Sequence, residues 1–99
     1  AVQVELDVRV RFHDEATPNA FNIVAEIPGT ELPNEVVIIS AHLDSWNGPG
    51  SQGTTDNGTC SSVTLEAARI LMAAKAQPKR TIRFILWTGE EQGLLGSKS

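Results

Sequence analysis

The sequence lacks the features that mark several classes of protein. Its single cysteine, Cys60, has no partner for an internal disulfide bond, so cysteine usage leaves the redox compartment open. The net charge is −4 and the basic residues form no cluster, which gives no electrostatic basis for binding nucleic acid or an anionic membrane. No apolar run approaches the roughly 20 residues that a membrane-spanning helix needs. We therefore expect neither nucleic acid nor membrane as a partner.

What is present fits one small globular unit. The 99 residues are 40% hydrophobic and 20% charged, which is ordinary for a single domain with a modest core. No repeat, low-complexity tract or linker divides residues 1–99. The chain starts without a methionine and stops where the pattern of a new helix begins. We therefore expect residues 1–99 to be a single partial domain from a longer protein.

Two N-terminal segments alternate apolar and polar residues, as strands with one exposed face do. In residues 2–12 the apolar residues occupy the even positions, and in residues 21–27 they occupy the odd positions, with Val24 as the exception. Residues 13–19 between them are rich in turn-forming types. The pattern predicts an antiparallel hairpin.

A βαβ unit is predicted next, which makes the fold α/β with a mixed sheet. Residues 36–41 and 82–87 are almost continuously apolar, which is typical of parallel strands that are buried on both faces. Between them, apolar residues recur at helical spacing and form the predicted core face of a helix. That face comprises Cys60, Val63, Ala67, Ile70, Leu71 and Ala74.

Polar residues follow each predicted parallel strand directly. His42 and Asp44 come after the first strand, and Glu90 and Glu91 come after the second. The crossover that joins parallel strands is almost always right-handed, so both strands end at the same edge of the sheet. Ligands of open α/β sheets bind at that edge. These residues should therefore meet at one site, with Asp56 beside them at the start of the helix.

Taken singly, each element has an ordinary structural explanation. A His-x-Asp pair occurs often by chance, Asp56 can form an Asx turn that caps the helix, and paired acids suit a helix start. The functional interpretation makes His42 a metal ligand whose other ring nitrogen donates to an acceptor such as Asp44. Asp56 would then bridge two metal ions, while one of Glu90 and Glu91 binds metal and the other takes a proton from water.

Together the three elements resemble the metal-binding core of the co-catalytic di-zinc exopeptidases. The resemblance lies in His42-Leu43-Asp44-Ser45, Asp56-Asn57-Gly58 and residues 87–97, and it extends through residues 21–26 and 79–83. That family includes secreted bacterial leucyl aminopeptidases and carboxypeptidase Q, and the carboxypeptidase Q branch is the nearer one. The resemblance implies a truncated phosphorylase/hydrolase-like architecture, of which this chain is the amino-terminal portion.

The resemblance also implies a role for each residue. His42 would bind one zinc ion, Glu91 the other, and Asp56 would bridge the two ions. Asp44 would orient His42, and Glu90 would be the general base that takes the proton of a metal-bridged water. The substrate would be a dipeptide or the terminal residue of a peptide, attacked as an aminopeptidase, carboxypeptidase or dipeptidase does. A secreted or periplasmic location is implied in the same way.

The sequence departs from the family pattern in two places. The family often has a second Asp joined to the bridging Asp by a cis peptide bond, whereas Asn57 follows Asp56 here, so a cis bond at this point is a hypothesis. Family members also complete the site with an Asp and a His further downstream. His13 is the only other histidine, and its place in the predicted hairpin turn makes it an ordinary surface residue. We therefore expect the 99-residue fragment to be inactive alone.

Two other functions stay open at this stage. The first is a non-catalytic binding module of the same fold that has dropped its metals. The second is hydrolysis by a nucleophile, Ser45 or Cys60, although neither lies in a Gly-x-Ser-x-Gly elbow and Cys60 falls on the predicted core face. A sheet that is cut short also leaves a strand edge exposed, which predicts self-association.

Overall fold

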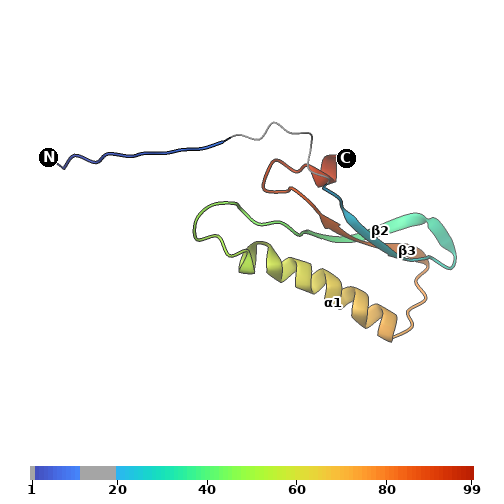
Figure 1. Cartoon of the computed structure of the whole chain (residues 1–99). Coiled ribbons are helices and arrows are strands. Elements are labelled where there is room, and N and C mark those ends of the chain that lie inside the picture. Colours follow the sequence, from blue (N-terminus) through green and yellow to red (C-terminus); the bar gives the residue numbers. More distant parts are fainter. Residues whose placement is uncertain (1, 12–19) are drawn as a thin grey trace.

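The computed structural model describes residues 2–11 and 20–99 and contains a small mixed sheet with one long helix (Figure 1). The helix lies along one side of the sheet. In chain order the elements are β1 (Ile23–Ile27), β2 (Leu32–His42), the short helical turn η1 (Thr54–Thr59), α1 (Cys60–Ala73), β3 (Arg80–Trp87) and the 3-10 turn η2 (Gly96–Lys98). In the part of the chain that the structure describes, no helix is long and apolar enough to cross a membrane.

β3 is the central strand of the sheet, whose order is β1-β3-β2. β1 pairs with β3 antiparallel and β2 pairs with β3 in parallel. The crossover from β2 to β3 runs through α1, so the predicted βαβ unit is confirmed. His42, the last residue of β2, is paired with Trp87, the last residue of β3. The loops after these two strands therefore start from the same edge of the sheet.

The core is centred on β3, as its continuous apolar sequence predicts. Phe84, Ile85 and Leu86 are all buried, although alternate residues of a strand face opposite sides of the sheet. Ile27 of β1 and Ala41 of β2 are buried beside them. β3 has a neighbouring strand on each side, which neither β1 nor β2 has.

The prediction that residues 36–41 are buried on both faces is wrong for β2. Val36, Val37 and Ile38 are 39–55% exposed. β2 lies at the edge of the sheet, and α1 covers only one face (Figure 1). An almost continuous apolar run predicted a strand correctly here, but it did not predict how many sides of that strand would be covered.

The predicted core face of the helix is wrong for most of its residues, although Ala67 and Leu71 are half-buried. Cys60 and Val63 are exposed, whereas Ser61 and Thr64 are the buried residues of α1. The Ser61 hydroxyl donates a hydrogen bond to the carbonyl oxygen of His42 at 2.9 Å, which fixes how the helix is rotated against β2. The buried face of the helix therefore starts with the small residues Ser61 and Thr64, and the apolar residues Val63 and Ile70 point away from the sheet.

The predicted N-terminal hairpin is not formed in the described residues. Residues 2–11 contain no strand and are exposed throughout, and they extend away from the sheet (Figure 1). The antiparallel partner of β1 is β3, which lies far along the chain. Alternation predicts that a segment suits a half-buried strand, but pairing is favoured only where an apolar face becomes covered. Ile23 and Val24 of β1 are themselves about half exposed, so they offer little cover. The predicted turn, with His13, lies outside the described residues.

Candidate metal centre

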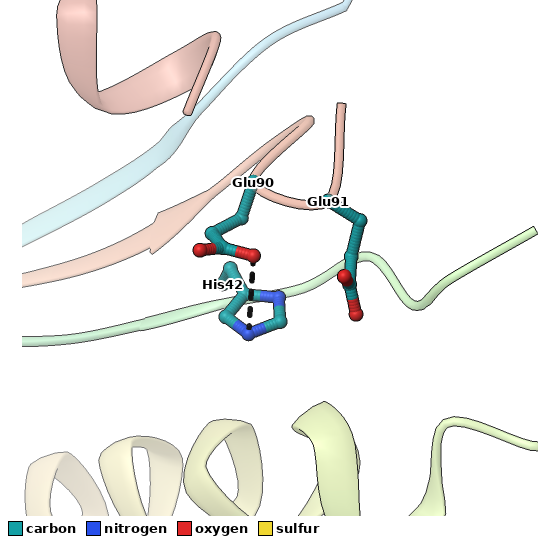
Figure 2. Close-up of side chains that lie close together, drawn as sticks. All are labelled: His42, Glu90 and Glu91. Carbon is teal, nitrogen blue, oxygen red and sulfur yellow. Dashed lines mark ion pairs between the residues drawn. The ribbon is translucent and has the colours of Figure 1, made fainter. Parts of the chain in front are cut away.

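His42, Glu90 and Glu91 converge at the edge of the sheet where β2 and β3 end (Figure 2). Each offers one atom that can bind a metal ion, and these atoms all lie within 4.8 Å of one another. His42 ends β2, and the two acids belong to the loop after β3. The prediction that residues far apart in the sequence meet at this edge is therefore confirmed for these three.

The imidazole of His42 is held through its Nδ1 atom. Nδ1 lies 3.1 Å from the main-chain carbonyl oxygen of Asp44 and 3.5 Å from the Asp44 carboxylate. An N–H at Nδ1 that donates to the carbonyl leaves a lone pair on Nε2. Nε2 lies 3.0 Å from Oδ1 of Asp56 and 3.9 Å from Oε2 of Glu90. Nε2 thus faces two carboxylate oxygens, an arrangement in which an imidazole and carboxylates can share a metal ion.

Asp44 acts mainly on the loop that carries the two acids. Its carboxylate oxygens accept hydrogen bonds from the main-chain N–H groups of Glu90 and Glu91, each at 3.1 Å. Burial by itself raises the pKa of Asp44, but these amides, its own amide and the nearby His42 outweigh burial and lower that pKa below its usual range. Asp44 is therefore ionised at neutral pH and ties the loop after β3 to the loop after β2.

Asp56 stands in η1, just before α1, and it contacts His42 without belonging to the three-residue group. Its backbone and that of Asn57 are non-helical, and the peptide bond between them is cis, so the cis hypothesis is confirmed. Asn57 is buried, while the Asp56 side chain is 72% exposed. The exposed carboxylate is open to ligands on the side away from His42.

The donor atoms suit a zinc ion. Zinc in proteins is bound by imidazole nitrogen and by carboxylate oxygen, and a catalytic site keeps one coordination position open. The side chains at this edge supply one imidazole nitrogen from His42 and carboxylate oxygens from Asp56, Glu90 and Glu91. Glu90, which the resemblance makes the general base, thus also offers a carboxylate oxygen to this group. The individual metal-ligand and catalytic roles stay predictions.

Neither candidate nucleophile gains support from the structure. Cys60 is exposed at the start of α1, and the sulfur of an exposed cysteine needs an activating base before it can act as a nucleophile. Ser45 is half-buried and packs closely against Gly53. A Cβ added to Gly53 would lie only 2.8 Å from the Cβ of Ser45. Gly53 has a φ of 62°, so this loop needs glycine for both its backbone conformation and its packing.

Known proteins that are similar to this chain include a carboxypeptidase and an aminopeptidase. A carboxypeptidase Q from Xenopus laevis is 41% identical over 96 residues, which cover 97% of this chain and 20% of that protein. Leupeptin-inactivating enzyme 1 from Streptomyces exfoliatus is 41% identical over 79% of this chain and 17% of its own length. An aminopeptidase from Pseudomonas aeruginosa (strain UCBPP-PA14) is 47% identical over 78% of this chain and 13% of its own length. The chain thus spans a fifth or less of these relatives.

The model of peptidase family M28 matches residues 22–99. That range begins just before β1 and includes all five residues for which a role was predicted from the sequence, namely His42, Asp44, Asp56, Glu90 and Glu91. The match confirms the resemblance to zinc exopeptidases that those residues carried. With most of its length matched, the chain belongs to peptidase family M28.

Proposed function

We propose that this chain is the amino-terminal part of the catalytic domain of a zinc-dependent exopeptidase. The observation that carries the proposal is the convergence of one imidazole and several carboxylates at the edge where β2 and β3 end. The names of the relatives, which include a carboxypeptidase and an aminopeptidase, support action at a peptide terminus. The substrate class is a dipeptide or the terminal residue of a peptide.

We assign each residue of the site a role in metal binding or proton transfer. His42, Asp56 and Glu91 would hold the two zinc ions, with Asp56 as the shared ligand. Zinc at this place would supply a Lewis acid for the scissile carbonyl and would lower the pKa of water. Glu90 would accept a proton from the attacking water at its carboxylate and pass it to the leaving amine. Oε2 of Glu90 lies 3.9 Å from Nε2 of His42, so this base stands beside the proposed ligands.

The chain alone is proposed to be inactive. One imidazole and three carboxylates at an open edge leave a pair of zinc ions short of ligands, because each zinc ion is usually held by three protein groups or more. The missing ligands would come from residues beyond those present here. A secreted or periplasmic location is part of the same proposal and rests on the likeness to secreted bacterial aminopeptidases.

Peptidase activity of a longer protein that contains this chain tests the proposal. We expect that protein to release terminal residues from peptides, to lose activity on chelation and to regain it with zinc. Glu90→Gln should lower kcat by about 10²–10⁴-fold, the usual contribution of a general base, while zinc content stays unchanged. As a control, Glu31→Gln changes an exposed acid that pairs with Lys79, away from the site.

The same measurements separate the proposal from its alternatives. A protein that binds no zinc and cleaves no peptide would be the non-catalytic module. Activity that survives chelation but is lost in Ser45→Ala would instead favour a serine nucleophile.

A further inference from the structure

The two acids of the candidate site lie in a loop that is closed at its base. The loop runs from Thr88 to Gly96, and the N–H of Gly96 donates to the carbonyl oxygen of Thr88 at 2.8 Å. Inside it, the N–H groups at positions 93 and 94 both donate to the carbonyl oxygen of Glu90 at 2.9 Å. The position of the Glu90 and Glu91 side chains therefore depends on how this base is held.

Asn22 holds the base of the loop with both ends of its side-chain amide. Its Oδ1 accepts a hydrogen bond from the N–H of Thr88 at 3.1 Å, and its Nδ2 donates to the carbonyl oxygen of Gly96 at 2.8 Å. Asn22 directly precedes β1, and the first residue of β1, Ile23, is paired with Leu86 near the end of β3. The antiparallel pairing thus delivers Asn22 to the edge of the sheet where the loop begins.

Gly96 is shaped for this contact. It is buried, and a Cβ at this position would collide with Oδ1 of Asn22 and would lie 2.5 Å from the carbonyl oxygen of Thr88. Any larger residue would push the asparagine side chain or the strand end away. The close approach of these three residues therefore requires a glycine at position 96.

Asn22 and Asp44 hold the loop from opposite sides. Asn22 precedes β1, Asp44 follows β2, and these two strands flank β3. Asn22 binds the first and last residues of the loop, and Asp44 binds the N–H groups of Glu90 and Glu91 between them. Both strands next to β3 thus contribute one polar side chain that fixes the loop.

We propose that Asn22 is a positioning residue for the Glu90-Glu91 pair. It fixes the base of the loop so that the two carboxylates stay directed at the His42 side of the edge. That Asn22 fixes the loop rests on its hydrogen bonds alone. That it thereby supports metal binding rests on the proposed function. The two parts can be measured separately.

Amide hydrogen exchange of the 99-residue chain, followed by NMR, tests the structural part. Asn22→Ala removes the hydrogen bonds to Thr88 and Gly96 and a longer one to the Ser99 hydroxyl. Protection at Thr88, Gly96, Glu90 and Glu91 should therefore fall about tenfold. Amides in the middle of β2 and α1 should keep their exchange rates. Gly96→Ala should reproduce the same local pattern, because the added Cβ displaces Asn22.

Two further variants sharpen this test. Asn22→Asp keeps an acceptor for the N–H of Thr88 but loses the donor to the carbonyl of Gly96. Protection should be retained at Thr88 and should fall at Gly96, because the released end of the loop weakens the hydrogen bond from the Gly96 N–H to the Thr88 carbonyl. Asn34→Ala changes an exposed asparagine of β2 and should leave the loop unaffected. Unchanged exchange at the loop in both Asn22→Ala and Gly96→Ala would overturn the inference. A uniform increase over the whole chain would also overturn it, because it would mean a general stabilising role.

Zinc affinity tests the consequence. Asn22→Ala should weaken zinc binding by about tenfold, as is typical for residues that orient ligands without touching the metal, whereas His42→Ala should abolish it. Equal zinc binding by the unmodified chain and His42→Ala would mean that the proposed function fails, while the exchange pattern still decides the structural role of Asn22. Unchanged affinity in Asn22→Ala beside a lost site in His42→Ala would overturn the positioning role alone.

Discussion

At the scale of single residues, the candidate site is formed by side chains whose partners lie in other loops. His42, Asp44, Glu90 and Glu91 were predictable because each follows an apolar strand, and parallel strands bring their ends together. Asn22 was not predictable in this way, because its partners are main-chain atoms 66 and 74 residues away. Main-chain atoms carry no sequence signal. Its only trace in the sequence was its place within a segment that resembles the family.

The two functions of Asp44 also became separable only with coordinates. The sequence predicted that its carboxylate orients His42. In the structure the main-chain carbonyl of Asp44 is the nearer acceptor for the His42 ring, and the carboxylate binds the N–H groups of Glu90 and Glu91. The alternation of side chains along a strand places His42 and Asp44 on one face. It does not predict that main-chain N–H groups of another loop will donate to Asp44.

Replacing Asp44 should make the chain less stable in a pH-dependent manner. The folded state lowers the pKa of this carboxyl group, so its contribution to stability is fully present above the pKa of the unfolded chain and is lost as the pH falls through the lower folded value. Near pH 7, Asp44→Asn should cost about 1.5–3 kcal/mol, the range for hydrogen bonds to a charged group. Below pH about 4 the difference should shrink. Urea unfolding at a series of pH values measures it.

An exposed carboxylate far from the site serves as the control for Asp44→Asn. Asp7→Asn changes an exposed carboxylate in residues 2–11 and should alter the free energy of unfolding little at any pH. If the cost of Asp44→Asn were the same at low and neutral pH, the loss would come from packing and the ionised carboxylate would not be its cause.

At the scale of elements, the βαβ unit followed from the sequence and the rotation of its helix did not. The sequence of α1 has two stripes at helical spacing, one that contains Ser61 and Thr64 and one that contains Val63, Ala67 and Ile70. Hydrophobicity favours the second stripe, but the bond from Ser61 to the main chain of His42 turns the first toward the sheet. A polar contact to the backbone thus decided the rotation.

The free edge and open face of β2 lead us to propose self-association. β2 is an edge strand with Val36, Val37 and Ile38 about half exposed, and such edges pair with other chains. The chain should therefore sediment as a mixture of monomer and larger species at high concentration. Ile38→Lys should shift the distribution toward monomer, since a charge on an edge strand opposes pairing.

A matched variant locates the contact. Val63→Lys places the same charge on the exposed face of α1 and should leave the distribution unchanged if β2 is the contact. A chain that stays monomeric at every concentration would refute self-association. A shift caused by Val63→Lys alone would move the contact to the helix.

At the scale of the whole molecule, membership of family M28 and the geometry at one sheet edge support the same function. The family match covers residues 22–99 and thus every residue of the proposed centre. The first strand of the predicted hairpin, residues 2–12, lies wholly outside the matched range, and residues 2–11 contain no strand in the structure. The family match and the sheet thus include the site and leave out residues 2–11. Most residues of the site lie at the ends of β2 and β3 or in the loops after them, where strand pairing positions them. Residues 2–11 alternate in the same way as a strand but are exposed and pair with no strand.

Zinc titration of the 99-residue chain by calorimetry is the most direct test of the central claim, that these residues form a metal centre. We expect saturable binding that is weak, because ligands are missing, and that falls by more than about tenfold in His42→Ala, Asp56→Ala and Glu91→Ala. Glu31→Ala, an exposed acid outside the site, should bind like the unmodified chain. Binding that is the same in all these variants would contradict the claim, because the zinc would then be held elsewhere.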